Sequence, residues 1–542
     1  MSVDVQFFEQ PSAPRLAGRI PQPPRKNDEG TGSKSRIVSE SLTSGNLPRG
    51  LLRGTARRGI QGGMPPWSQG AGPCPARERE AGSEATVGRG KREAGSPSKL
   101  TARPKTAALI TLGCAKNLVD SEVMLGCLWK AGYRFTSDPA AADVVILNTC
   151  GFIRPAREEA EAEIRKLVRI KKRTPGQKLV VAGCYVEKSR DLLLKKFPDV
   201  DLWTGVSDFD RIVRLVEGKP VVPSKNAFLY NHASPRAVST PRSWAYIKIS
   251  EGCSHRCSFC SIPSIKGRFR SRSRSSIIKE ARILTSAGVR EINLISQDTT
   301  YYGRDRGEKH GLAALLRDLL SVRQLEWIRI LYGYPEEIHS PLLEVMKEKK
   351  ICPYLDIPFQ HASARILQGM KRGLDGPRAL RLIDKIRKEI PDAALRTSLI
   401  VGFPGEGERQ FRDLAGFVRR ARLDHLGVFT YSPEEGTAAA VLGDPVPEKT
   451  KQARREEILE IQSSISRENN GKYTGRILDV LLEGPLQDEP GAWVGRTRYQ
   501  APEVDGVVLV KGGSPGRTSS GPIRKVEIVS ADVYDLIGIF TG

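Results

Sequence analysis

Three short apolar runs, each followed by a cysteine, most constrain the fold of this 542-residue chain. The runs "AALITLGC", "DVVILNTC" and "KLVVAGC" end at Cys114, Cys150 and Cys184, which lie 36 and 34 residues apart. Each gap holds a segment with helical periodicity, and short buried strands that alternate with helices are typical of a parallel sheet covered on both faces. The sequence therefore predicts an open parallel α/β domain over residues 105–220.

The three cysteines all follow the carboxyl ends of predicted strands. Because open parallel sheets bind their ligands beyond these ends, three thiols placed there converge on one point. The alternative is three unrelated core cysteines, since a free cysteine behaves as a small hydrophobic residue. Three converging thiols suit a metal centre that keeps one coordination position open, and we predict such a centre at Cys114, Cys150 and Cys184.

A second, compact cysteine cluster follows the strand-like run "WAYIKIS". Cys253, Cys257 and Cys260 form a C-x3-C-x2-C pattern, whose three thiolates can hold three irons of a [4Fe–4S] cluster and leave the fourth iron free. A structural zinc site needs four protein ligands, and this loop offers no fourth cysteine or suitably spaced histidine. His255, between two of the cysteines, is predicted to be a solvated loop residue.

Cysteine usage and charge limit the compartment and the partner. Nine cysteines are too few for a disulfide scaffold in a chain of this length, and their clustering favours metal binding in a reducing compartment. No apolar run approaches the ~20 residues of a membrane span, and no secretory segment opens the sequence. We therefore expect a cytoplasmic protein without membrane contact. The net charge of +24 suggests an anionic partner such as RNA or a ribonucleoprotein surface.

The rest of the chain divides by composition. Residues 1–104 lack periodicity and are rich in Pro, Gly, Ser and Arg, so we predict a disordered basic extension, which a wrongly assigned translation start would also explain. Residues 221–241 are predicted to be a linker and residues 448–470 a connecting helix. Residues 471–542 contain short strands and turns that predict a small β-barrel. Its 8 Lys and Arg against 9 Asp and Glu argue against tight phosphate binding.

Helix-like and strand-like segments alternate through residues 242–447, which predicts parallel strands with a site at their carboxyl ends. Four polar residues follow predicted strands there, and we predict that they bind the cofactor: Gln297, Asp298, Gln360 and His361. Cys127 and Cys352 lie within a helical and an apolar segment, so we expect both in the core.

The compact cluster, with Phe259 before its last cysteine, resembles the signature of the radical S-adenosylmethionine (SAM) superfamily. The added dispersed triad is similar to the methylthiotransferases of that superfamily, and within them to the enzymes that modify an aspartate of a small-subunit ribosomal protein. The segments that carry this resemblance are residues 112–122, 148–159, 257–272, 295–303, 356–363, 402–406, 430–439 and 495–506. Gly333 and Gly407 depart from the pattern near the expected SAM pocket.

The resemblance implies a partial β/α barrel in the middle of the chain and a TRAM domain at its end. It implies an enzyme that uses SAM and two [4Fe–4S] clusters to insert a methylthio group at the Cβ of an aspartate in a small-subunit ribosomal protein. An electron donor and a sulfur source are implied as further partners, and we expect a monomer. Glu503 and Asp505, in "QAPEVDG", would suit a basic protein partner.

Two other functions remain open from the sequence. A tRNA-adenosine methylthiotransferase would carry both clusters, and the overall basicity favours it, whereas "KNLVDSE", "QAPEVDG" and the near-neutral C-terminal segment favour a protein substrate. A non-enzymatic Fe–S or RNA-binding protein would not require both triads to leave an iron open.

Overall fold

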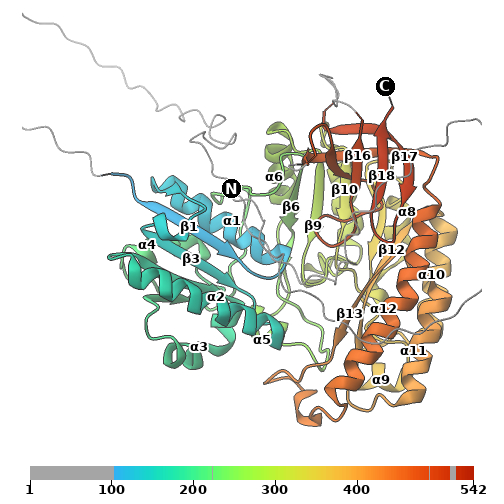
Figure 1. The fold of residues 1–542 in the computed structure, drawn as a ribbon, viewed down its shortest axis with the longest axis horizontal. Coiled ribbons are helices and arrows are strands. Elements are labelled where there is room, and N and C mark those ends of the chain that lie inside the picture. The colour runs from blue at the N-terminus through green and yellow to red at the C-terminus, as the bar shows by residue number, and fades with distance from the viewer. Residues whose placement is uncertain (1–102, 223, 487–488, 513–520, 542) are drawn as a thin grey trace, which may run out of the picture.

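The computed structural model describes residues 103–541 except 223, 487–488 and 513–520. Nearly all of the predicted disordered extension, residues 1–104, lies outside the described residues. Three bodies follow one another along the chain: an α/β domain, a larger sheet with helices on one side, and a small barrel (Figure 1).

The N-terminal domain is built on a five-stranded parallel sheet of order β2-β1-β3-β4-β5. Its strands are β1 (Thr106–Thr111), β2 (Arg134–Phe135), β3 (Val144–Thr149), β4 (Lys178–Gly183) and β5 (Leu202–Thr204). Its helices are α1 (Ala115–Lys130), α2 (Arg154–Arg173), α3 (Cys184–Lys196) and α4 (Ile212–Val216). Alternate strand residues enter different cores, Ile146 on one face and Leu147 on the other, because successive side chains of a strand point in opposite directions. The predicted open parallel α/β domain is confirmed.

The central domain is a six-stranded parallel sheet of order β13-β12-β11-β10-β9-β6, open between its edge strands. Its strands are β6 (Trp244–Lys248), β9 (Glu291–Ile295), β10 (Trp327–Ile330), β11 (Ile351–Asp356), β12 (Ala394–Val401) and β13 (His425–Thr430). The helices that connect these strands include α6 (Arg274–Ser286), α7 (Gly311–Leu320), α8 (Ser340–Val345), α10 (Gly376–Glu389) and α11 (Glu408–Ala421). Together they enclose the largest core of the described chain. The predicted partial barrel is therefore confirmed.

Two short helices of this domain escape sequence analysis, α5 (Ile262–Lys266) and α9 (Ala364–Gly369). Five or six residues are too few for a helical period to show in the pattern of apolar residues. Both helices lie beside the compact cysteine loop, α5 directly after it and α9 through backbone contact with Ser258.

The segment that connects these two domains is irregular but packs against both of them. From residue 217 to residue 243 its described residues form no helix or strand, yet Tyr230 is only 1% exposed. Arg236 joins both sides, with its guanidinium 2.6 Å from Glu122 on α1 and 2.5 Å from Glu280 on α6. Because this arginine is buried with two carboxylates, it holds the N-terminal domain against the barrel.

A long helix, α12 (Glu448–Gly471), leads to a closed barrel of strand order β14-β15-β16-β18-β17. These strands are β14 (Ile477–Pro485), β15 (Trp493–Arg496), β16 (Val508–Lys511), β17 (Ile523–Ala531) and β18 (Leu536–Phe540). Arg496 of this barrel pairs at 2.7 Å with Glu291, the first residue of β9. The small barrel, which confirms the prediction, thus packs toward the amino ends of the central strands, opposite to the cysteine loop.

The prediction that Asp505 faces a protein partner is wrong. Its side chain has no exposed surface, and its carboxylate accepts hydrogen bonds from Arg396 at 2.6 Å and from the Tyr354 hydroxyl at 2.7 Å. Glu503 likewise accepts a hydrogen bond from Tyr246 at 2.7 Å. The sequence shows two acids in a turn but not the arginine and tyrosines of distant strands that bind them, so both acids look available.

Replacing Asp505 by asparagine is expected to lower the unfolding midpoint of the protein. The change leaves the buried Arg396 guanidinium with only Asp356, 3.9 Å away, as a carboxylate partner, and breaking a buried ion pair costs about 3–5 kcal/mol. Urea unfolding followed by tryptophan fluorescence measures the effect. Asp479→Asn is the matched control in the same barrel, because its pair with Lys525 is solvent-exposed and such pairs contribute about 0–1 kcal/mol. Equal shifts in the two variants would contradict the structural role of Asp505.

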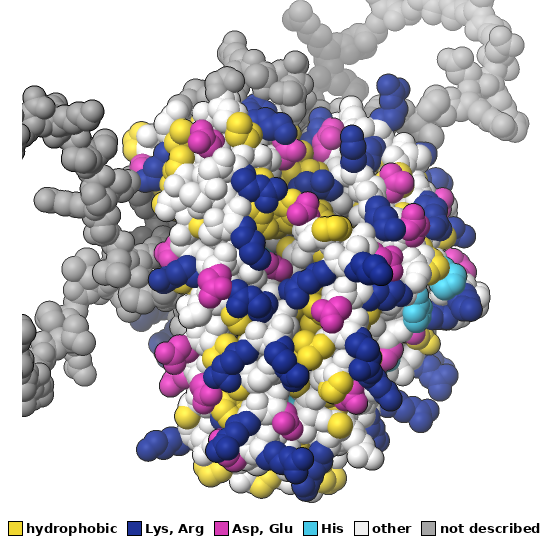
Figure 2. Space-filling view, turned by 90° about the vertical axis from the view of Figure 1, so that its right-hand side faces the viewer, with side chains coloured by type: hydrophobic (Ala, Val, Ile, Leu, Met, Phe, Trp, Pro, Cys, Tyr) yellow, Lys and Arg dark blue, Asp and Glu magenta, His cyan; other side chains and the backbone are white. Residues whose placement is uncertain are grey.

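The distribution of surface charge says less about an anionic partner than the total charge suggests. On the face in Figure 2, Lys and Arg side chains are spread among Asp and Glu side chains without gathering into one continuous patch. No helix of the described residues is long and apolar enough to cross a membrane. The net charge of +24 therefore does not by itself mark a groove for RNA on this face.

Candidate metal centres and active site

The dispersed cysteines gather at the carboxyl edge of the N-terminal sheet. Cys114 precedes α1, Cys150 follows β3, and Cys184 begins α3 directly after β4. Cys150 packs against the backbone at Gly113, where an added Cβ would lie 2.6 Å from the Cys150 Cβ and 3.2 Å from its Sγ. Gly113 also has φ of +94°, so glycine is needed there on both counts. The turn after β1 thus admits Cys150 beside Cys114.

Asn117, in the first turn of α1, ties the three strand exits together. Its amide nitrogen donates to the carbonyl of Leu112 at 3.0 Å and to that of Thr149 at 3.2 Å. Its amide oxygen accepts from the Cys184 thiol at 3.6 Å. The side chain is 2% exposed, and a buried amide with these partners fixes the relative positions of the cysteines.

The dispersed thiols interact electrostatically. Burial raises the pKa of Cys184 to about 12, and the nearby Cys114 adds to that shift. The pKa of Cys150 is raised by burial and further by Cys184 and Cys114. These raised values mean that the thiols hold their protons until a metal displaces them, since coordinated cysteines are thiolates.

The compact triad lies on a loop at the carboxyl end of the first central strand, directly after β7 (Ser250–Glu251). A Cβ at Gly252, whose φ is +80°, would lie 2.3 Å from the carbonyl oxygen of Arg268, so only glycine permits this turn before Cys253. Ser258, inside the loop, is fastened to the end of α9 by hydrogen bonds to the carbonyls of Met370 and Gly369. The loop is therefore held at both its start and its middle.

The environment of these thiols is buried and basic. Burial raises the pKa of Cys253 to about 11 and that of Cys260 to about 12. The Arg372 guanidinium lies 3.7 Å from the Cys257 Sγ and 4.0 Å from the centroid of the Tyr334 ring. A fixed cation at this distance stabilises thiolate charge. Sequence analysis missed Arg372, because it lies in a turn after α9 where no periodicity or motif marks it.

His255 is not the solvated loop residue that the sequence predicts. Its ring stacks on Tyr334, with centroids 3.7 Å apart and planes 6° from parallel. Its Nε2 lies 2.5 Å from an Asp298 carboxylate oxygen. The prediction failed because its partners come from the loops after two other strands, which the local sequence does not show.

Both cysteine sets fit an iron–sulfur cluster that leaves one iron for another ligand. Each set offers three thiols near one another and near buried charges. Within the described part of the chain, no three His, Cys, Asp or Glu side chains are close enough to hold a single metal ion. The cysteines of a [4Fe–4S] cluster each bind a different iron and so need not approach as the ligands of one ion do.

The predicted cofactor residues of β9 lie around the compact loop. Gln297 donates from its amide nitrogen to Glu251 at 2.7 Å, while its amide oxygen is buried without a hydrogen-bond partner in the described structure. Asp298 is 2% exposed and also accepts from the Thr300 hydroxyl at 2.6 Å. The amide oxygen of Gln297 is therefore available to accept a hydrogen bond from a ligand.

The two predicted cofactor residues after β11, Gln360 and His361, differ in burial and in hydrogen bonding. Gln360 is half-buried and has φ of +70°, a conformation that is uncommon for residues other than glycine. His361 has no exposed surface. Its Nδ1 accepts from the Ser363 backbone N–H at 2.9 Å, and its Nε2 lies 3.1 Å from Glu406. No ring nitrogen of His361 is left for a ligand.

Four buried charges join the two cysteine sites. Lys248 pairs with Asp120 of α1 and, at 2.7 Å, with Glu251. Lys266 of α5 lies 3.2 Å from Asp120 and 3.6 Å from Glu251. Glu251 and Lys266 also act electrostatically on Cys184. Since Glu251 lies two residues before Cys253, this neutral tetrad lies between the triads and holds α1 against the compact loop.

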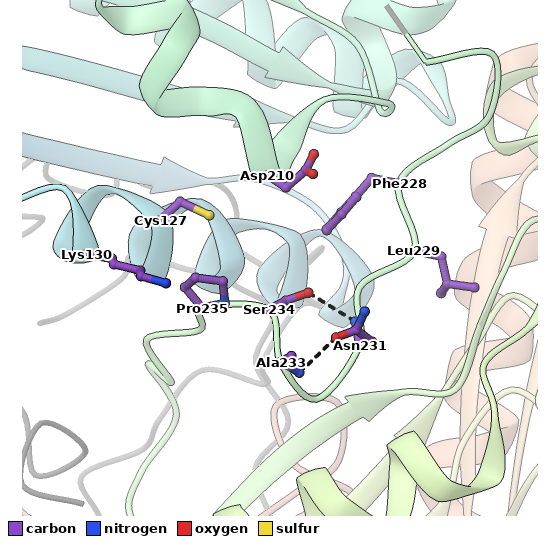
Figure 3. Close-up of a pocket in the computed structure, with 9 residues that line it drawn as sticks. All are labelled: Cys127, Lys130, Asp210, Phe228, Leu229, Asn231, Ala233, Ser234 and Pro235. Atoms are coloured by element: carbon purple, nitrogen blue, oxygen red, sulfur yellow. Dashed lines mark hydrogen bonds between the residues drawn. The ribbon is translucent and has the colours of Figure 1, made fainter. Parts of the chain in front are cut away.

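One surface cavity lies away from both triads. A cavity of about 500 Å³ opens beside α1 and is lined by Cys127, Lys130, Asp210, Phe228, Leu229, Asn231, Ala233, Ser234 and Pro235 (Figure 3). Cys127 is half-buried there, whereas Cys352 is fully buried in β11. The cavity holds none of the six triad cysteines, and we assign the chemistry to the triads and not to this cavity.

Family comparisons divide the chain as its fold does. The model of uncharacterized protein family UPF0004 matches residues 106–205, that of the radical SAM superfamily matches residues 247–418, and that of the TRAM domain matches residues 474–540.

Characterised relatives match the chain over most of its length. It is 45% identical to the ribosomal protein uS12 methylthiotransferase RimO of Aquifex aeolicus over 431 residues, which are 79% of this chain and 96% of the relative. It is also 45% identical to the RimO of Syntrophus aciditrophicus, covering 80% of this chain and 98% of the relative. Among solved structures, the radical SAM methyltransferase TsrM of Kitasatospora setae is 14% identical with a TM-score of 0.48, covering 62% of this chain and 77% of that one.

Proposed function

The chain belongs to the RimO family of radical SAM methylthiotransferases, and from this premise we propose that its substrate is ribosomal protein uS12. The acceptor is the Cβ of an aspartate of that protein. The enzyme uses SAM and two [4Fe–4S] clusters. The observation that carries the proposal is the 45% identity to ribosomal protein uS12 methylthiotransferases over about four fifths of the chain. The two cysteine triads, joined by the buried tetrad, support the methylthiotransferase chemistry.

Each triad has its own role, and the two roles belong to different domains. When bound, the clusters and SAM supply a carbon-centred radical, a sulfur atom and a methyl group, which are needed because an aspartate Cβ–H has no usable acidity. Cys253, Cys257 and Cys260 would hold the cluster that supplies the radical from SAM. The other three, Cys114, Cys150 and Cys184, hold the cluster that carries the sulfur. The tetrad keeps the two loops at a constant separation, as transfer between fixed groups requires.

We assign three of the predicted polar residues to SAM binding. Gln297, Asp298 and Gln360 lie after strands whose carboxyl ends adjoin the compact loop, where barrel enzymes bind their ligands. We assign His361 a positioning role, because its bond to Glu406 anchors a carboxylate that also accepts from the Gly402 backbone N–H at 3.0 Å. It thereby supports the loop after β12. An external electron donor and an external sulfur source complete the reaction, and the enzyme acts as a monomer.

A tRNA-adenosine methylthiotransferase is the second candidate, since the chain carries a net charge of +24. Two arginines of the C-terminal barrel are bound within the protein: Arg496 pairs with Glu291 and Glu483, and Arg498 donates to the carbonyls of Lys349 and Ile351. Arginines bound in this way cannot also displace the counterions of a nucleic acid. This arrangement favours the protein substrate.

Mass spectrometry of both substrates tests the proposed function. The anaerobically reconstituted enzyme is incubated with SAM, a reductant and either uS12 or a tRNA anticodon stem-loop. We expect a methylthio group on one aspartate of uS12 and none on the RNA. Modification of the RNA alone would overturn the proposal, and modification of neither substrate by an enzyme that still cleaves SAM would do the same.

A further inference from the structure

Lys116 reaches from the N-terminal domain to the carboxyl edge of the barrel. It lies on the first turn of α1, two residues after Cys114, and its Nζ is 3.3 Å from the centroid of the Tyr332 ring. Tyr332 follows the end of β10, and its backbone N–H donates to Asp356, the last residue of β11, at 3.2 Å. One ammonium group therefore lies where the dispersed triad and the strand exits of the barrel meet.

The charge of Lys116 is not neutralised by an ion pair. No Asp or Glu carboxylate of the described residues lies within 4.0 Å of its Nζ. The two other lysines between the domains differ, since Lys248 and Lys266 each lie within that distance of both Asp120 and Glu251. A half-buried ammonium that contacts an aromatic face has lost part of its hydration without gaining a counterion. Such an ammonium group attracts an anionic ligand.

Tyr332, whose ring contacts the Lys116 ammonium, has an unusual backbone conformation. Tyr332 has φ of +63°, a left-handed conformation that is uncommon for a residue with a Cβ. Asp356 holds it there through one carboxylate oxygen, while the other is buried and accepts no hydrogen bond in the described structure. Arg396 lies 3.9 Å from that second oxygen and balances its charge. The site thus combines an unpaired cation with an unused buried acceptor.

We propose that Lys116 binds the side-chain carboxylate of the substrate aspartate, an inference that rests on the proposed function. The acceptor carbon is bonded directly to that carboxylate carbon, so one charged contact places the Cβ beside both cluster loops. The unused oxygen of Asp356 is an acceptor for a peptide N–H of the same segment. Lys116 is a specificity-determining residue in this scheme, because an adenine base has no carboxylate for it to bind.

A double-mutant cycle between the enzyme and a peptide tests the contact. Fluorescent peptides that span the target segment of uS12, with either aspartate or asparagine at the acceptor position, are titrated anaerobically into the reconstituted holoenzyme. The wild type is expected to bind the aspartate peptide about 10- to 100-fold more tightly, since a hydrogen bond between charged groups is lost with asparagine. Lys116→Met should bind both peptides with the affinity of the wild type for the asparagine peptide. Lys116→Arg should keep most of the preference.

Lys130→Met is the matched control, because Lys130 is exposed on the last turn of the same helix. It should keep the full preference for aspartate. A Lys116→Met enzyme that retains normal iron content and still prefers aspartate as strongly as the wild type would overturn the role of Lys116 alone. A wild-type enzyme that binds and methylthiolates neither uS12 nor its peptide would instead overturn the proposed function, so the two failures are distinguishable.

Discussion

Replacing Cys114, Cys150 and Cys184 together by alanine is expected to give an enzyme that cleaves SAM but transfers no methylthio group. The three thiols lie in the N-terminal domain, whereas the loop with Cys253 belongs to the barrel and has its own supports at α9 and Gly252. Loss of the dispersed triad should therefore remove one cluster and leave the other, so that iron falls from about eight to about four atoms per chain.

The measurements are iron content, 5′-deoxyadenosine by chromatography and methylthio-uS12 by mass spectrometry. Cys127→Ala is the matched control, because this cysteine lies on α1 but outside both triads, and it should keep both products. Normal methylthiolation by a triple variant with full iron content would show that the three strand exits hold no ligand.

Replacing Cys253, Cys257 and Cys260 by alanine is expected to abolish both reactions. This loop is the one whose free iron would bind SAM, so its loss should remove SAM cleavage and every step that depends on it. The dispersed triad should still hold about four irons, because Asn117 fixes its strand exits independently of the barrel. The same assays apply, with Cys352→Ala as the control. Formation of 5′-deoxyadenosine by the triple variant would contradict the assignment of the radical-generating cluster.

These two variants are informative because the two triads lie in different domains, which meet through buried charges and a shared apolar cluster. Asp120 belongs to the helix that begins beside Cys114, and Glu251 precedes Cys253 by two residues. Lys248 and Lys266 bridge them without contacting solvent. The tetrad holds α1, which begins beside Cys114, against the loop that carries Cys253.

The pairs between charged side chains of different strands and loops also show where sequence analysis reached its limit. Asp505 in "QAPEVDG" looked like a surface acid, and His255 looked solvated, because a local pattern reports only what a residue's own element does. Their partners, Arg396 and Asp298, belong to other strands. Such pairs form only when surfaces that are distant in the chain meet, and neither periodicity nor composition encodes that meeting.

The sequence alone determined the order of the three domains, the parallel sheets and the cysteines that end their strands, because strand length, helical period and thiol spacing are local properties. The tertiary structure decided how these parts combine. It placed Lys116 of the first domain over Tyr332 of the second. It also buried the tetrad between the triads and turned the Asp505 side chain inward. The physical reason is that the contacts of a side chain at a domain boundary come from distant parts of the chain, and these contacts exist only once the domains have docked.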